Sequence, residues 1–442
     1  MASREEILTK NARNKIYLRA NSIRGRSIAN SKTWTKKVLS KAGIPVPRLI
    51  AVFKNSWDVD NFVWEKIENS FVVKPSGSSG GEGVWVIKKK AKWAGEWFLV
   101  DGTKVGASDL RYHCLDALQG RFSLGGFADK VLVEERIKIH PKFLRFTRTG
   151  TPDIRVIIYN GIPVMAMLRI PTEESKGKAN LHQGAIGLGL DLATGITTFG
   201  VHHEQMIKRI YDLKRKKWIK VNGIKVPEWK KILQTAVECS QAVEGLSFFG
   251  ADLFLDKAEG PIVVELNARP GLSIQICNKA GLKVRLVRAE GLKARNVDHA
   301  VKIAQTLFGE SFVDKVKAEE GIKVVEILES VRVRVKSGKR QEVLAKIDTG
   351  ALRSSIDYDL AKELGLLDPN NILFYRHYRS ASARMHKRPV IALTFYLKGR
   401  RIKTAVNATN RSHLNTAMLI GRRDLGGFLV KPEPVNTKVS YR

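Results

Sequence analysis

The sequence predicts an α+β protein in two parts, a mixed helix-and-strand part up to about residue 310 and a smaller all-β part over 322–442. Three observations support this prediction. The chain has 442 residues, more than one small hydrophobic core accommodates. Helical and strand patterns alternate through the first part, whereas the last part shows short alternating strands with a single helix candidate. Between them the charged stretch DKVKAEEG (314–321) predicts a linker over 311–321.

The elements of the first part follow from local signals. SKTWTKKVLSKAG (31–43) predicts a helix ended by Gly43. FVVKP (71–75) is a strand that runs through a Gly/Ser loop (76–83) into VWVIKKK (84–90), the plan of a hairpin and not of a Walker A loop. The other predicted elements are the strands VLVEERI (131–137), DIRVIIYN (153–160) and PVMAMLRI (163–170), the last two joined by an Asn160-Gly161 turn, the helix WKKILQTAVECSQAVEGL (229–246), and the strand pair FFGADLFLD (248–256) and PIVVELN (261–267).

The charge is large and concentrated at the two ends. There are 77 Lys+Arg and 43 Asp+Glu, a net charge of +34; residues 1–50 hold 12 basic and 2 acidic side chains, and residues 321–442 hold 24 and 10. Such a balance favours anionic partners, namely RNA or ribosomes, acidic peptides, or a membrane surface. A generally basic proteome would also explain it. The hydrophobic content of 43% excludes a mainly disordered chain.

The Lys-rich segment 205–231 has two interpretations. It is either a solvated basic hairpin or helix end, or an arm that contacts RNA. The chain also shows no apolar run long enough for a membrane span and no apolar leader at its start. Its three cysteines lie far apart without metal-ligand spacing. We therefore expect a cytoplasmic protein in a reducing environment.

Two groups of residues point to nucleotide chemistry. Lys74, at the end of a strand and beside the flexible loop 76–83, can neutralise phosphate groups while the loop closes over them. Glu265 and Asn267 share one face of a strand, and pairing with the preceding strand brings Asp252 alongside. Carboxylate and amide oxygens suit a magnesium ion that holds ATP phosphates. The alternative is a common surface loop and a strand that ends in solvated polar groups.

The stretch from Asn11 to about residue 285 resembles the ATP-grasp fold, and within it the RimK-like α-L-glutamate ligases and the α-L-glutamate ligase-related proteins. The resemblance covers about 270 residues with the spacing of the motifs kept. The segments that carry it are NARN (11–14), KKVLSKAGIPVP (36–47), FVVKPSGSSGGEGVWVI (71–87), VLVEERI (131–137), DIRV (153–156), RIPTEESKGKANLHQGAIGLGLDLATG (169–195), GADLFLD (250–256) and VELNARPGLSIQI (264–276).

The resemblance implies site residues position by position. VLVEERI matches the hinge between the two grasping halves, where glutamates meet adenine and ribose. Arg169 would be the catalytic cation near the transferred phosphoryl group, while Arg269 and Ser273 could contact the acceptor. Asp252, Glu265 and Asn267 would bind Mg²⁺, with Mn²⁺ as an alternative. The residues expected to bind ATP are Lys32, Lys74, Ser78, Gly80, Gly81, Glu134, Glu135, Asp153, Lys178 and Asn180.

The chemistry that the resemblance implies is ATP-dependent ligation of a carboxylate and an amine. The carboxylate would attack the γ-phosphoryl group to give an acyl phosphate, and the amine would displace phosphate to form an amide. One departure matters, because RimK-like ligases often carry Arg-Ser-Asn where this chain has Lys178, Ala179 and Asn180. The donor or acceptor therefore remains open.

The last part carries a second motif. AKIDTGALRSSI (345–356) places Asp348 in an Asp-Thr-Gly turn after an apolar strand, and MLIGRRDL (418–425) follows about 70 residues on. This order resembles retropepsin-like aspartic proteases, specifically the RimB-like ATP-dependent zinc protease family. Since there is one such turn, a catalytic pair would need a homodimer, with Arg353 and Arg384 near the cleft. No zinc spacing is found among His377, His386 and His413.

The sequence thus predicts an ATP-grasp ligase over 1–310, with a helical substrate segment (1–50) and a nucleotide-binding core (51–310), followed by a retropepsin-like domain over 322–442. We expect it to add glutamate or a similar amino acid to a peptide or protein, with the last domain trimming or binding the acidic product. Two alternatives stay open: a non-catalytic basic module that binds RNA or ribosomes, and a ligase whose last domain only binds peptides.

Overall fold

The computed structural model describes residues 6–78, 80–92, 95–123, 125–148, 150–309, 323–379 and 385–431. The chain divides into two compact units, Met1–Glu290 and Gly291–Arg442. The predicted linker over 311–321 lies outside the described residues. The helix α10 (Val297–Leu307), which we assigned to the first part, packs on β20 and β22 and so belongs to the second unit.

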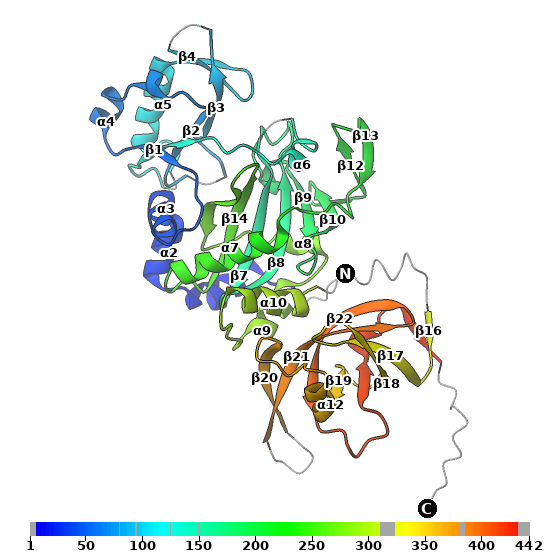
Figure 1. Cartoon of the computed structure of the whole chain (residues 1–442). Helices are drawn as coiled ribbons and strands as arrows, with labels where there is room; N and C mark the ends of the chain where they lie inside the picture. Colours follow the sequence, from blue (N-terminus) through cyan, green and yellow to red (C-terminus); the bar gives the residue numbers. More distant parts are fainter. Residues whose placement is uncertain are drawn as a thin grey trace, which may run out of the picture. The chain divides into compact units, whose positions relative to one another are not determined.

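The first unit begins with α1 (Lys10–Ala12), α2 (Ile23–Asn30) and α3 (Lys32–Lys41). α3 is the predicted helix, and Gly43, with a φ of +72°, follows it in the left-handed conformation that glycine adopts without cost. An antiparallel sheet comes next, in the order β1-β6-β2-β3-β4-β5 (Figure 1). Its strands are β1 (Leu49–Phe53), β2 (Phe71–Pro75), β3 (Trp85–Lys90), β4 (Glu96–Leu99), β5 (Lys104–Gly106) and β6 (Val131–Glu135).

One buried apolar cluster holds this sheet to its helices α4 (Ser56–Asp60) and α5 (Ala107–Leu118). The cluster includes Phe71, Trp97 and Leu110, all at most 1% exposed. The predicted hairpin of β2 and β3 is confirmed, since Val72 pairs with Val86 and Val73 with Trp85. The sheet therefore fixes both ends of the glycine loop between these strands.

The second sheet of the first unit has the order β11-β10-β9-β8-β7-β14-β15 and is antiparallel throughout. The turn between β7 and β8 is the predicted Asn160-Gly161, both with positive φ. The helices α7 (Trp229–Ala242), α8 (Ile274–Asn278) and α9 (Leu282–Ala289) pack on it. Its strands are β7 (Asp153–Tyr159), β8 (Ile162–Ile170), β9 (Ile186–Leu190), β10 (Thr197–His202), β11 (Gln205–Ile207), β14 (Phe248–Asp256) and β15 (Gly260–Asn267).

The Lys-rich segment forms a separate two-stranded sheet of β12 (Arg209–Asp212) and β13 (Lys217–Lys220). Of the forms we considered for the segment 205–231, the hairpin accounts for residues 209–220, while residues 229–231 are the first turn of α7. The turn of the hairpin lies at residues 213–216, and Asn222-Gly223, a turn dipeptide in the sequence, forms a separate turn after β13.

The second unit contains a closed barrel. Strands follow the order β17-β18-β23-β19-β22-β21-β20, and β17 also pairs with β21, which closes the ring. β17 alternates buried and exposed residues as predicted. Among the described residues of this unit, the helices α10 and α12 (Tyr358–Glu363) accompany the strands, so the unit is not purely β. The strands are β16 (Lys323–Val325), β17 (Leu328–Arg334), β18 (Arg340–Asp348), β19 (Ser355–Asp357), β20 (Ile372–Arg379), β21 (Met385–Leu397), β22 (Arg400–Thr409), β23 (Met418–Gly421) and β24 (Phe428–Val430).

Candidate functional site

A buried cluster of two lysines and one glutamate lies where α3 meets β2 and β6. The ammonium nitrogen of Lys74 lies 2.8 Å from Oε2 of Glu134, and that of Lys36 lies 2.9 Å from Oε1. Each of the three side chains is at most 10% exposed. Burial lowers the pKa of Lys36 to about 8. Burial also opposes the charge on Glu134, but the two ammonium groups hold the pKa of that carboxyl below its ordinary value.

Lys32 ties the start of α3 to the glycine loop. Its ammonium group donates to the carbonyl oxygens of Ser78 and Ser76. The loop start is held further by Asp129, whose carboxylate accepts from the Gly77 amide at 2.7 Å. Burial lowers the pKa of Lys32, and the nearby carboxylate of Glu265 opposes this shift. Lys32 therefore stands between the glycine loop and the acidic end of β15.

The far end of the loop lies against the segment that follows β8. A Cβ atom on Gly81 would lie 3.3 Å from Cγ of Lys178, and one on Gly80 would lie 3.5 Å from Nδ2 of Asn180. Gly80 has a φ of +65° and Gly81 a φ of +76°, a backbone conformation that residues with side chains rarely adopt. Asn180 uses its Oδ1 to accept from the His182 amide. The loop and the residues 178–180, predicted separately, thus come together.

A network of two aspartates and two arginines crosses the second sheet. Arg169 on β8 sits directly opposite Asp153 on β7 and donates to both of its carboxylate oxygens. Arg169 also donates to Oδ2 of Asp252 at 2.8 Å. Arg155 on β7 sits opposite Asp252 on β14 and donates to both its oxygens, at 2.7 and 2.6 Å. Adjacent strands therefore place four charges on one face.

The surroundings shift the pKa values of Asp153 and Asp252 in opposite directions. Burial and the neighbouring Asp252 carboxylate raise the pKa of Asp153 to about 6, although the Arg169 guanidinium opposes this shift. Burial also acts to raise the pKa of Asp252, but Arg155 and Arg169 together hold that pKa below its ordinary value. Asp252 therefore stays ionised near neutral pH, as a metal ligand must.

The predicted metal ligands gather at the end of β14 and β15. Asp252 pairs with Glu265 and Gly250 with Asn267 across these strands, and Asn267 Nδ2 donates to Asp252 Oδ2 at 3.1 Å. This contact leaves Asn267 Oδ1 as the acceptor end of the amide. Within the described residues, the Glu265 carboxylate makes no hydrogen bond or ion pair. Two carboxylates and an amide oxygen form a hard donor set that fits Mg²⁺.

Glu135, also expected at the nucleotide, follows Glu134 and so lies on the opposite face of β6. Its carboxylate pairs with the exposed Arg48 at 2.8 Å. Sequence reasoning missed Lys36, Arg155 and Asp129. Only Arg155 had a usable signal, since it lies two residues after Asp153 and hence on the same strand face.

The second unit holds Asp348 at the end of β18. Its Oδ1 accepts from the amides of Gly350 and Ala351 at 2.9 and 3.1 Å. Gly421 of β23 lies beside Asp348, and a Cβ there would lie 2.6 Å from the backbone carbon of Arg353. The hydroxyl of Ser354 donates to Asp424 and accepts from the Gly421 amide. MLIG and the Asp-Thr-Gly turn therefore pack together, while Arg384 lies outside the described residues.

This arrangement of two antiparallel sheets, a glycine loop and strand-end carboxylates is that of an ATP-grasp protein. The chain belongs to the sugar-transfer associated ATP-grasp family, whose model matches residues 11–291. A phosphoribosylamine–glycine ligase from Archaeoglobus fulgidus is 39% identical over 108 residues, which are 24% of this chain and 19% of that protein. The match thus spans about a fifth of the curated relative's length.

Several solved structures are similar at low sequence identity. A D-alanine–D-alanine ligase from Bacillus anthracis is 16% identical, with a TM-score of 0.31 over 68% of this chain and 72% of that one. The ATP-grasp ligase PsnB with its minimal precursor is 17% identical, with a TM-score of 0.32 over 61% and 62%. Lpg0085 from Legionella pneumophila is 19% identical, with a TM-score of 0.18 over 25% of this chain and 93% of that one.

Among the helices that the structure describes, none combines the length and apolar character needed to cross a membrane.

Proposed function

We propose that the first unit is an ATP-dependent carboxylate–amine ligase. The observation that carries this proposal is that Lys32 lies between the glycine loop and the acidic end of β15. Its ammonium group donates to the carbonyl oxygens of Ser76 and Ser78 in the loop, and the Glu265 carboxylate is near enough to oppose the lowering of its pKa by burial. ATP chemistry without a protein nucleophile has two requirements. Cations must be placed to meet the phosphate groups, and oxygen ligands must be placed to bind a divalent cation.

The chain's own residues would act by position and charge. Lys32 and Lys74 neutralise the phosphate oxygens, while Glu134 keeps Lys74 and Lys36 in place. Asp252, Glu265 and Asn267 would hold Mg²⁺, which would neutralise further phosphate charge.

Arg169 stabilises charge on the phosphoryl group as it passes to the substrate carboxylate. A carboxylate oxygen bonds to the γ-phosphorus and ADP leaves with the electrons of the broken bond. The amine then attacks the acyl carbon, loses a proton, and phosphate departs.

The substrate follows from the finer resemblance to RimK-like and α-L-glutamate ligase-related proteins. We propose glutamate or a similar amino acid as one partner and a peptide or protein as the other. The supporting observation is a group of cations near β15, since Arg13 donates to the Pro270 carbonyl at 2.8 Å and lies near Arg269. Cations here suit a substrate that carries carboxylates.

The experiment is a screen of amino acids and acceptor peptides with ATP and Mg²⁺, read out by ADP release and product mass. The proposal expects ADP release that depends on an amino acid and is lost in Glu265→Ala. Glu259→Ala, in the exposed turn between β14 and β15, is the matched control and should retain activity. ADP release that needs no amino acid, or that survives in Glu265→Ala, would contradict the ligase.

A second candidate function belongs to the barrel. We propose that Asp348 from two copies of the chain forms a retropepsin-like pair that cleaves acidic peptides, with the ordered turn at Asp348 and its packing on Gly421 as support. Cleavage lost in Asp348→Asn but kept in Asp359→Asn, an exposed aspartate of α12, would support it. Binding of peptides without cleavage would leave the barrel a peptide-binding module of the ligase.

A further inference from the structure

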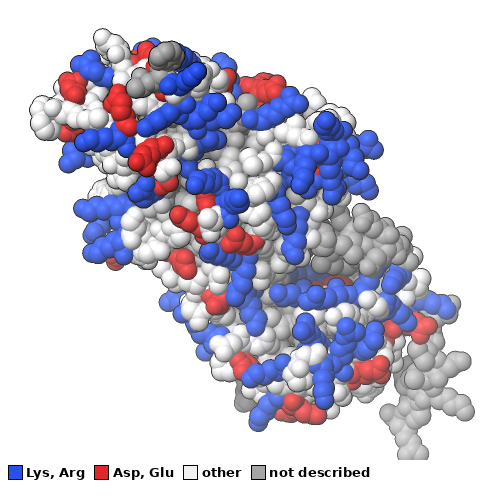
Figure 2. Space-filling view, turned by 45° about the horizontal axis from the view of Figure 1, so that its top comes forward, with Lys and Arg blue, Asp and Glu red and all other residues white. Residues whose placement is uncertain are grey.

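The hairpin β12–β13 and the lysine before it form a compact basic arm that the proposed ligase chemistry does not use. Residues 208–220 hold seven lysines and arginines and one acid, Asp212. In Figure 1 the two strands form a sheet of their own, separate from the seven-stranded sheet. Figure 2 shows that Lys and Arg form several dense groups on the face drawn, with patches of acidic side chains among them.

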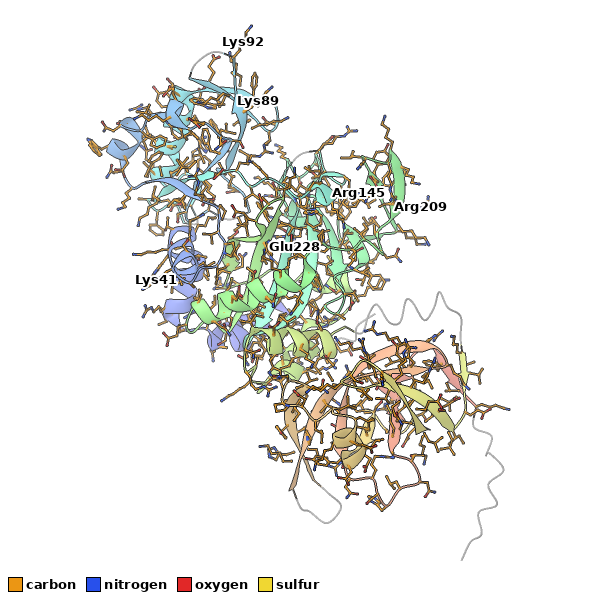
Figure 3. The ribbon with its side chains drawn as sticks, in the orientation of Figure 1. Lys41, Lys89, Lys92, Arg145, Arg209 and Glu228 are labelled. Carbon is orange, nitrogen blue, oxygen red and sulfur yellow. The ribbon has the colours of Figure 1, made fainter. Side chains whose placement is uncertain are left out.

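Hydrogen bonds hold the base of the arm to Arg145. Asp212 is fully buried, and its carboxylate accepts from the guanidinium group of Arg145 and from the amides of Lys214 and Arg215, the last two at 3.1 Å. The Leu213 amide donates to the Arg145 carbonyl at 2.8 Å. Figure 3 shows Arg145 and Arg209 on the same side of the molecule. The single acid of the arm, Asp212, is thus buried at its base, where the exposed Arg215 also lies 3.9 Å from its Oδ2.

The register of the hairpin separates two faces. Ile210 pairs with Ile219 and Asp212 with Lys217 on the inner face, where Ile210 is only 3% exposed. Arg209 pairs with Lys220 and Tyr211 with Trp218 on the outer face. Trp218 is 62% exposed, and its ring lies 5.6 Å from that of Tyr211 in an edge contact. The outer face therefore offers an aromatic pair beside a pair of cations.

We infer that this outer face binds single-stranded nucleic acid. Cations at one end of a short sheet hold phosphate groups, and an exposed indole supported by a second ring is a stacking platform for a base. An acidic peptide would need the cations but not the exposed indole. An anionic membrane would need several outward apolar side chains, whereas both isoleucines lie on the inner face. This inference goes beyond the proposed ligase activity and does not depend on it.

The test is the fluorescence anisotropy of a labelled oligouridylate of about twelve nucleotides with the full chain, at about 50 and 200 mM salt. Trp218→Ala should weaken binding about ten-fold or more. Lys220→Gln, which removes one of the two cations on the outer face, should reduce the dependence of log affinity on log salt by about one unit. The matched controls are Trp57→Ala, which removes a tryptophan that is 70% exposed on α4, and Lys92→Gln, which removes an exposed lysine outside the arm. Both should bind like the wild-type chain.

Three outcomes would overturn the inference. The first is no binding of the oligonucleotide at low salt, or equal loss in Trp57→Ala and Trp218→Ala. The second is polyglutamate that competes fully and binds independently of Trp218, which would indicate an acidic protein partner. The third is binding to phosphatidylserine vesicles, but not to the oligonucleotide, with a blue shift of tryptophan fluorescence that is absent in Trp218→Ala. Unchanged thermal unfolding of each variant confirms that the loss is local.

Discussion

At the scale of the residue, single carboxylates that each hold two cations organise the proposed ATP site. Glu134 lies between Lys36 and Lys74, and Asp252 accepts from Arg155 and Arg169. In both cases cations that would meet phosphate are fixed before ATP arrives, so less reorganisation is needed on binding. The same arrangement makes each carboxylate a structural residue, because its removal leaves buried cations without a partner.

Glu134→Gln should therefore destabilise the first unit by about 3 kcal/mol, the cost of breaking a buried ion pair by removing one partner. Glu135→Gln is the matched change, one residue on, where the pair with Arg48 is exposed and contributes about 0.5 kcal/mol. Urea unfolding of the two variants measures the difference. Equal destabilisation by both changes would show that the lysines do not depend on Glu134.

Lys36 predicts a pH dependence of stability. Its pKa is about 8 in the folded chain, below the ordinary 10.5, so between these values the unfolded state binds more protons than the folded state. The free energy of unfolding of the wild-type chain should then rise, relative to that of Lys36→Met, by at most about 1.4 kcal/mol per pH unit between pH 8 and 10. Parallel pH curves for the two proteins would rule out the shifted lysine.

Elements position these residues through sheet order rather than through sequence distance. β7 lies between β8 and β14, so Asp153 and Arg155 each face an oppositely charged partner on a different neighbour. The β2–β3 hairpin carries the glycine loop to residues 178–180 in the same way. A loop that must approach another segment closely needs glycine both for its positive φ and for the missing side chain.

Two glycine variants separate these needs. Gly81→Ala introduces strain at a φ of +76° and a Cβ 3.3 Å from Lys178, whereas Gly43→Ala introduces similar strain at +72° with nothing within 4 Å. Each should cost about 1 kcal/mol in stability. Only Gly81→Ala should raise the KM for ATP, by several-fold, in an ADP-release assay. An equal rise in both would mean that the loop does not contact nucleotide.

At the scale of the whole molecule, the sequence predicted those features that depend on residues close together in the chain. The strand pair that bears Asp252, Glu265 and Asn267, and the hairpin after Lys74, are formed as expected because their partners are neighbours in the chain. The Lys36–Glu134 pair could not be predicted, since it joins elements that only the fold brings together. The amphipathic pattern of α10 shows that one face is buried but does not identify the unit that buries it.

The net charge of +34 is likewise explained only in part by motifs. Lys32, Lys36, Lys74 and Arg169 serve the proposed ATP site, whereas the cations of β12–β13 lie on an arm with a different chemistry. In our proposals, one group of cations binds the phosphates of ATP and a second group binds a separate anionic partner. The two uses are separable by mutation because the arm has its own sheet.

The central claim, transfer of the phosphoryl group to a carboxylate, is tested most directly by turnover in ¹⁸O-labelled water with the amino acid and acceptor that support ADP release. Our account predicts inorganic phosphate without label from water, since the bridging oxygen comes from the substrate carboxylate, and loss of this phosphate in Glu265→Ala. Phosphate that carries ¹⁸O from water in each turnover would show ATP hydrolysis instead and would contradict the ligase.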